Sequence, residues 1–100
     1  MTEVQKQKAI MDYFDKTIFE PAVVYGKTNN LMDIVRGVNL TRARMSRLSS
    51  EKMIQYFWSA IIGTDKSIKF SKMMKEHNIL RFEDIIEEVR EKFNEDFLRA

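Results

Sequence analysis

The stretch NLTRARMSRLSS, residues 39–50, decides how the middle of this chain folds. It spaces three arginines among three large apolar residues, and it opens with an asparagine, a residue that tolerates the left-handed backbone of a turn. On an ordinary surface helix these arginines would only be solvated side chains. A turn at Asn39 would instead separate two short helices and gather the arginines on the second one.

The composition predicts one helical domain. The 100 residues suffice for one domain, and a hydrophobic content of 44% provides for a core. Only three glycines and one proline occur, which favours helices over a sheet with many tight turns. The absence of cysteine excludes disulfides and thiol-ligated zinc. The charged N-terminus does not resemble a secretory signal, and the longest apolar run, residues 53–62, covers about half of a membrane span. We therefore expect a soluble cytoplasmic protein.

The charged residues are distributed unevenly along the chain. Residues 36–75 contain nine basic and two acidic side chains, whereas residues 76–100 contain four basic and eight acidic ones. A basic block of this kind indicates a polyanionic partner, or two halves of the chain that attract each other.

Hydrophobic periodicity and helix breakers predict an all-α fold of about six helices. Pro21 should end the first helix, and the stretch PAVVYGKTNN that it begins should form a loop. Asn29 or Asn30 should cap the second helix, and Asn39 should terminate it. The expected helices cover approximately residues 3–19, 31–37, 42–48, 51–62, 64–77 and 82–98.

The central residues match the spacing rule of a helix-turn-helix. Ile34, Val35 and Val38 fill the buried places of the first short helix. Asn39 then takes the turn, where glycine is commonest, and Leu40 is the apolar residue of the turn. The inward-facing places of the second short helix fall on Met45 and Leu48.

On these residues the segment IVRGVNLTRARMSRL resembles the helix-turn-helix of many bacterial and archaeal DNA-binding regulators and recombinases. Val35 departs from the alanine usual in such motifs, and Asn39 departs from the usual glycine. The resemblance implies a tri-helical DNA-binding unit over about residues 3–50, whose second motif helix enters the major groove. Residues from about 51 to 100 would add a helical core or dimerisation part to the same single domain.

The exposed side of the second motif helix is then the predicted DNA-binding site. The hydroxyl of Thr41 and the first backbone N–H groups would hold a phosphate. The forked guanidinium donors suit guanine edges and phosphates, and Ala43 is small enough to let the helix approach the bases closely. The predicted site consists of Thr41, Arg42, Ala43, Arg44, Ser46 and Arg47.

The sequence therefore predicts a regulator that binds double-stranded DNA, and a homodimer would suit such a short protein. The dimer interface could be the last helix or the helix around Trp58. A helical protein-binding module or inhibitor without a nucleic-acid role is the alternative, because methionines and aromatic residues are abundant and the last helix is acidic. RNA binding by the same basic surface is a less favoured hypothesis, since no aromatic residue stands among the arginines.

Catalytic and metal-binding patterns do not emerge from the sequence. His77 is the single histidine and has neither cysteine nor a second histidine as a companion ligand. No glycine-rich phosphate loop and no nucleophile elbow occurs. We expect a protein that is not an enzyme and that has no metal, small-molecule cofactor or membrane partner.

Overall fold

The computed structural model of the chain describes residues 1–62, 74–79 and 82–93. These residues form the α-helices α1, α2, α3, α4 and α6, one π-helix and a further helical turn at 74–76, and they contain no β-strand. The predicted all-α fold is confirmed, although several helix boundaries differ from those expected.

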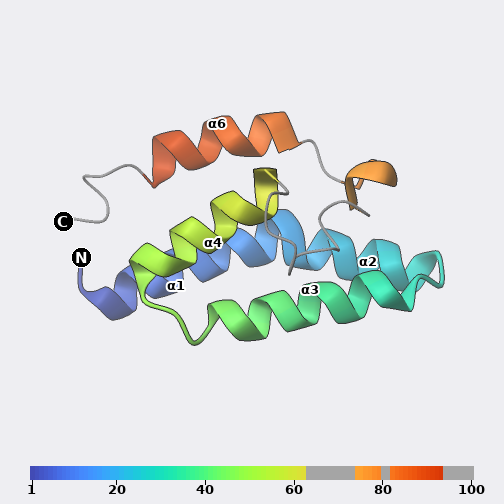
Figure 1. Cartoon of the computed structure of the whole chain (residues 1–100), viewed down its shortest axis with the longest axis horizontal. Coiled ribbons are helices and arrows are strands. Elements are labelled where there is room, and N and C mark those ends of the chain that lie inside the picture. The colour runs from blue at the N-terminus through green and yellow to red at the C-terminus, as the bar shows by residue number, and fades with distance from the viewer. Residues whose placement is uncertain (63–73, 80–81, 94–100) are drawn as a thin grey trace.

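The first three elements form one continuous helical run, which consists of α1 (Glu3–Phe14), the π-helix η1 (Asp15–Phe19) and α2 (Glu20–Thr28) (Figure 1). A capping box begins the run: the Thr2 hydroxyl accepts from the Gln5 backbone N–H at 3.2 Å, and the Gln5 side chain accepts from the Thr2 N–H at 2.9 Å. The stretch PAVVYGKTNN, predicted as a loop, is therefore mostly helix.

Pro21 does not end the first helix, which corrects the prediction. Proline lacks an N–H, and in an α-helix its ring clashes with the carbonyl four residues earlier. Here the turn before Pro21 is π-helical, and the Glu20 N–H reaches back five residues to the Asp15 carbonyl. We attribute the continuity of the run to this wider turn, which gives the proline ring room.

A tight turn joins α2 to α3 (Met32–Met45). Asn30 takes the left-handed conformation with φ of 55°, and the Leu31 N–H donates to the Gly26 carbonyl at 2.7 Å. The prediction that Asn29 or Asn30 caps the next helix is wrong, because Leu31 stands at that cap position and offers no side-chain hydrogen bond. The two asparagines instead end α2 and turn the chain back on itself.

α3 runs unbroken through Asn39, so the predicted helix-turn-helix geometry is wrong. Asn39 lacks the positive φ of a turn residue, and its side-chain amide donates to the Val35 carbonyl at 2.8 Å, four residues earlier in the same helix. The two short helices predicted at residues 31–37 and 42–48 are thus replaced by one helix of 14 residues. Its buried positions, Ile34, Val38, Thr41 and Met45, keep one helical period across the expected break.

The second half of the chain agrees better with the predicted boundaries. α4 (Ser50–Ile62) and α6 (Phe82–Lys92) begin close to the expected positions. Asn78, expected to break the helix before it, lies in a turn with φ of 54°. Three predicted features lie outside the described residues: most of the helix at 64–77, residues 94–98 of the last helix, and the side chain of Trp58.

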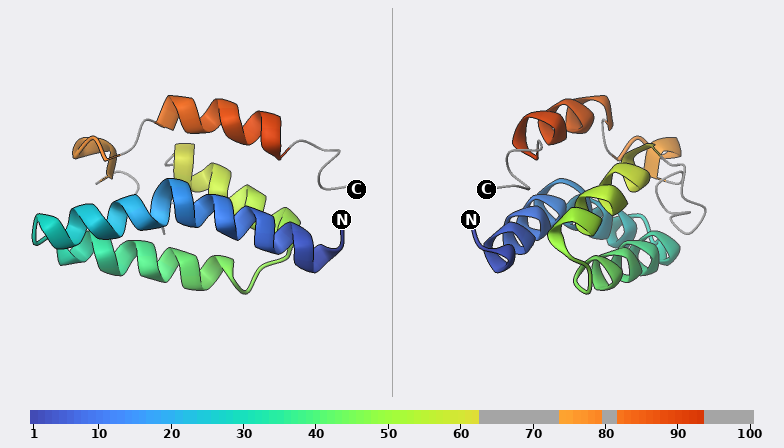
Figure 2. Two further views of the ribbon diagram at one scale, coloured as in Figure 1. Left: turned by 180° about the vertical axis from the view of Figure 1, so that it is seen from behind. Right: turned by 60° about the vertical axis from the view of Figure 1, so that its left-hand side comes forward.

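The helices stack in layers around the long run (Figures 1 and 2). α3 packs on one side against α2 and η1, α4 packs against α1, and α6 lies on the side away from α3. Aromatic rings join the layers, with Phe57 of α4 at 5.8 Å from Tyr13 and 6.1 Å from Phe14 between ring centroids. The largest fully buried side chains include Ile10, Phe14, Ile18, Ile34, Val38, Met45, Met53 and Phe57.

Candidate interaction surface

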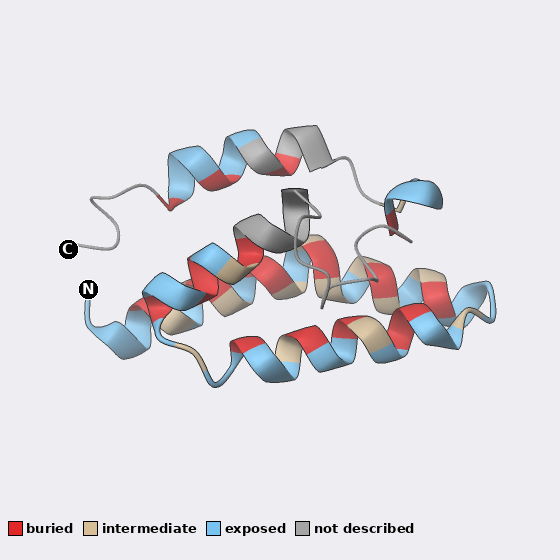
Figure 3. Cartoon of the chain, in the orientation of Figure 1, coloured by how far each residue is buried: buried red, intermediate tan, exposed pale blue. Residues whose placement is uncertain are grey.

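The two sides of α3 differ sharply in burial (Figure 3). The inner side packs its apolar residues against α2 and η1, with Ile34, Val38 and Met45 fully buried. The opposite side is exposed and mixes charged with apolar side chains. We define the outer face of α3 by its exposed residues Asp33, Arg36, Leu40, Ala43 and Arg44, with Met32 at its start and Arg47 in the turn that follows.

Two residues of the predicted DNA site are structural. Thr41 is only 2% exposed, and its hydroxyl donates to the Gly37 carbonyl at 3.0 Å inside the helix, so it neither caps a helix nor faces solvent. Arg42 points toward η1, where its guanidinium donates to both carboxylate oxygens of Asp15 at 2.6 and 2.9 Å. The same guanidinium lies 5.3 Å from the centroid of the Phe19 ring.

The hydrogen bonds to Asp15 raise the pKa of Arg42 above its already high ordinary value. Arginine is therefore charged at every accessible pH, and the pair acts as a fixed clamp between α3 and η1. The side chains are 41% and 23% exposed, which means that solvent still screens the attraction. Because Arg42 is occupied in this way, it is a packing residue between α3 and η1 and not part of an open surface.

The other four predicted residues remain at the surface. Ala43, Arg44, Ser46 and Arg47 are exposed, and the Ser46 hydroxyl donates to the Ala43 carbonyl at 2.7 Å. Within the described part of the chain, no ion pair engages Arg44 or Arg47. Two of the three predicted arginines, Arg44 and Arg47, are thus exposed near the end of α3. The third, Arg42, is paired with Asp15 and is not available at this surface.

Sequence reasoning missed Leu40 and Asp33 as surface residues. Leu40 was expected in the turn, but its side chain lies in the middle of α3 and is 52% exposed. Asp33 lies two turns before it on the same side of the helix, and its carboxylate is 3.6 Å from Arg36 in a pair of highly exposed side chains. The period Ile34, Val38, Thr41, Met45 would have placed both outside, had the polar Thr41 been accepted as an inward position.

The turn after α3 is fixed from α1. The Glu3 carboxylate accepts from the backbone N–H of Ser50 at 2.6 Å and from its hydroxyl at 2.8 Å, which caps the start of α4. These hydrogen bonds lower the pKa of Glu3 below its ordinary value of 4.5. The Gln7 amide donates to the Leu48 carbonyl at 3.1 Å. Arg47 is therefore presented directly before residues 48–50, which these hydrogen bonds hold against α1.

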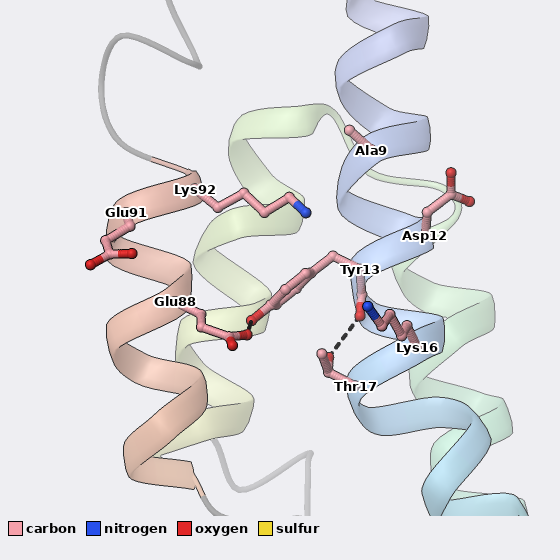
Figure 4. Close-up of a pocket in the computed structure, with 8 residues that line it drawn as sticks. All are labelled: Ala9, Asp12, Tyr13, Lys16, Thr17, Glu88, Glu91 and Lys92. Carbon is pink, nitrogen blue, oxygen red and sulfur yellow. Dashed lines mark hydrogen bonds between the residues drawn. The ribbon is translucent and has the colours of Figure 1, made fainter.

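A concave region lies between α1 and α6 and measures about 800 Å³ (Figure 4). The Tyr13 hydroxyl crosses from α1 and donates to the Glu88 carboxylate at 2.6 Å, and the Lys92 ammonium lies 5.1 Å from the centroid of the Tyr13 ring. Burial, followed by the bond to Glu88, raises the pKa of Tyr13 well above its ordinary value. This phenol stays protonated and serves as a donor that attaches α6, so the cleft is a polar seam between helices.

A more apolar groove of about 510 Å³ lies beside α2. Pro21, Val24 and Ile79 contribute to its lining. Its neighbour is the 74–79 segment, which a 3.3 Å contact between the Tyr25 hydroxyl and the His77 Nδ1 atom holds against α2. His77 is thus a packing partner of Tyr25.

Metal-binding clusters and membrane-spanning helices are absent from the described residues. Residues 1–62, 74–79 and 82–93 bring no three His, Cys, Asp or Glu side chains into a metal-binding arrangement. No helix among these residues combines the length and apolar character needed to cross a membrane.

Comparison of the chain with protein-family models, with curated proteins and with solved structures gives no match. The interpretation of the outer face of α3 therefore depends on its own geometry and charge.

Proposed function

We propose that this protein is a small helical protein-binding module and that the outer face of α3 is its docking surface. The observation that carries the proposal is Leu40, a large apolar side chain that is 52% exposed at the centre of a well-packed helix. Arg36 and Arg44 stand one turn before and one turn after it. An apolar contact between cationic side chains fits a partner helix that carries a leucine-like residue among carboxylates.

The mixture of apolar and basic residues favours a protein over a nucleic-acid backbone. Met32, at the start of the same face, is 43% exposed and adds apolar surface that phosphates cannot use. Arginine is common at protein interfaces because its stem packs while its fork pairs with carboxylates. Arg44 and Arg47, which have no ion-pair partner within the described residues, supply that charge.

A synthetic amphipathic peptide tests the proposal. The probe is a fluorescent helical peptide with leucines on one side and glutamates beside them, and the control peptide has lysines in place of the glutamates. Fluorescence anisotropy should show binding of the acidic peptide and little binding of the basic one. Leu40→Ser should weaken binding about fivefold, because roughly 1 kcal/mol of apolar burial is lost for a half-exposed leucine.

Two further variants make the peptide test specific to the face. Arg44→Ala should weaken binding several-fold at low salt and less at high salt, since exposed charges are screened. Val24→Ser is the matched control, because Val24 is 63% exposed but lies on α2. Equal binding by Leu40→Ser, Arg44→Ala and Val24→Ser, or no binding of the acidic peptide, would rule out this docking surface.

Duplex DNA is the second candidate partner. If the protein binds DNA, we propose that it regulates transcription. Arg36, Arg44 and Arg47 are exposed along the same side of α3 and its following turn, and such guanidinium groups displace counterions from phosphates. Titration of a labelled duplex over a salt series decides between the candidates. Binding that falls by orders of magnitude with salt, and that weakens in Arg44→Ala and Arg47→Ala, would favour DNA over an acidic protein partner.

A further inference from the structure

We infer that the outer face of α3 docks a second copy of this chain as an antiparallel helix pair. The inference rests on the proposed function, because it names the partner of the same face. It begins from one line of residues along α3: Asp33, Gly37, Leu40 and Arg44. These positions follow one another at spacings of four, three and four residues, so they share one side of the helix.

The spacing of this line is the same when it is read in reverse. Two copies of α3 that meet in opposite directions, with a two-fold axis at the level between Gly37 and Leu40, place each Asp33 opposite Arg44 of the partner subunit. The same operation places each Leu40 opposite the partner's Gly37. A two-fold interface requires such self-complementarity, in which each contact occurs twice.

On the line itself charge and shape suit this arrangement, whereas Arg36 and Arg47 beside the line give each copy a net positive face and weaken the pair. Among the described residues the ion pair of Asp33 is a 3.6 Å contact to Arg36. Their side chains are 80% and 76% exposed, so Asp33 is available to another arginine. Arg44 is exposed and has no ion pair within the described residues. Gly37 is partly buried and has no side chain, which leaves room for a leucine from the facing helix.

Leu40 gives the pair its apolar contact. The side chain of Leu40 is 52% exposed, and a facing helix would cover this exposed surface. The two-fold axis produces the same contact in both copies. Two exposed ion pairs and two half-buried leucines give a weak association, on the order of 0.1–1 mM in dissociation constant. The dimer would thus form at high local concentration, and salt would weaken it.

A charge swap within one chain tests the inference by analytical ultracentrifugation. Wild-type protein should increase in average mass toward a dimer as its concentration rises to about 1 mM in low salt. Asp33→Arg and Arg44→Asp should each raise the dissociation constant about tenfold or more, because each substitution places two like-charge pairs in the interface. The double variant D33R/R44D should return to within about threefold of wild type, since both pairs are restored with reversed sign.

Circular dichroism at the same temperature confirms that each variant is folded, which matters because Asp33 and Arg44 also complement the dipole of α3. A double variant as weak as the single ones, or a wild-type protein that stays monomeric at every concentration, would overturn the antiparallel pair. If the monomeric protein still binds the acidic peptide through Leu40 and Arg44, the proposed function stands and only the second copy is excluded. If it binds neither, both fail.

Discussion

Arg42 should stabilise the fold and contribute nothing to an open binding surface. Its guanidinium makes two hydrogen bonds to Asp15 and lies over Phe19, and its side chain is 41% exposed. Charged hydrogen bonds contribute about 1.5–3 kcal/mol when shielded, whereas exposed ion pairs contribute about 0–1 kcal/mol. The half-exposed pair with its ring contact lies between these limits, and Arg42→Ala should lower the free energy of unfolding by about 1–2 kcal/mol.

Urea denaturation and thermal melting measure this loss. For a chain of this size it corresponds to a decrease of roughly 5–10 °C in melting temperature. Arg44→Ala is the matched control, because Arg44 lies on the same helix but is exposed, and its effect should stay within about 0.5 kcal/mol. A double-mutant cycle with Asp15→Asn should give a coupling of about 1 kcal/mol. An Arg42→Ala variant that is as stable as wild type but binds the acidic peptide more weakly would refute the clamp. It would show that Arg42 belongs to the binding surface.

Three further substitutions test the packing that presents α3. Met45→Ala should destabilise the fold by about 2–5 kcal/mol in urea denaturation, because Met45 is fully buried; a loss below 1 kcal/mol would contradict its core position. Gly26→Ala should cost about 1–3 kcal/mol in the same assay, since the added Cβ atom would lie 2.6 Å from the Val35 Cγ2 atom between α2 and α3, and an unchanged stability would show that the helices pack less closely. Glu3→Gln should remove a pH-dependent contribution: the lowered pKa of Glu3 means that its bond to Ser50 stabilises the fold above pH 4.5 and is lost as pH falls through the lower folded value. Melts of wild type and variant should converge in acid, and a gap that widens in acid would reverse the assigned sign.

Helix class and most of the core could be predicted from the sequence because apolar spacing reports directly on burial. Ile10, Phe14 and Ile18 recur every four residues and are all buried. Ser50 starts α4 as expected, and Asn78 interrupts the chain as expected. These features depend on local spacing and on local backbone preference, which a single sequence carries.

The errors arose where tertiary packing overrides a local preference. Pro21 and Asn39 are both helix breakers by preference, yet a π-helical turn accommodates the first and an ordinary helical turn contains the second. Asn30, which has the same preference as Asn39, does take the left-handed turn. The buried side of α3 includes the polar Thr41, whose hydroxyl is satisfied within the helix, and that hid the continuous period.

The candidate surface could be predicted only in part. The exposure of Arg44 and Arg47 follows from the position of Met45 on the buried side. The pairing of Arg42 with Asp15 could not be predicted. The two residues are 27 positions apart, and the π-helical turn that carries Asp15 leaves no clear pattern in the sequence. The exposure of Leu40 likewise depends on whether the chain bends at Asn39.

The unbroken course of α3 through Asn39 is the claim on which the docking surface depends, and glycine substitution tests it most directly. Asn39→Gly should lower the free energy of unfolding by about 0.5–1 kcal/mol, because glycine weakens a helix interior and removes the amide bond to Val35. Asn30→Gly should leave stability unchanged or raise it by up to about 1 kcal/mol, because Asn30 has φ of 55° and glycine takes that conformation without strain. The predicted result in urea denaturation is a loss of stability for Asn39→Gly and no loss for Asn30→Gly. Stabilisation by both substitutions would place a bend at Asn39 and contradict the continuous helix.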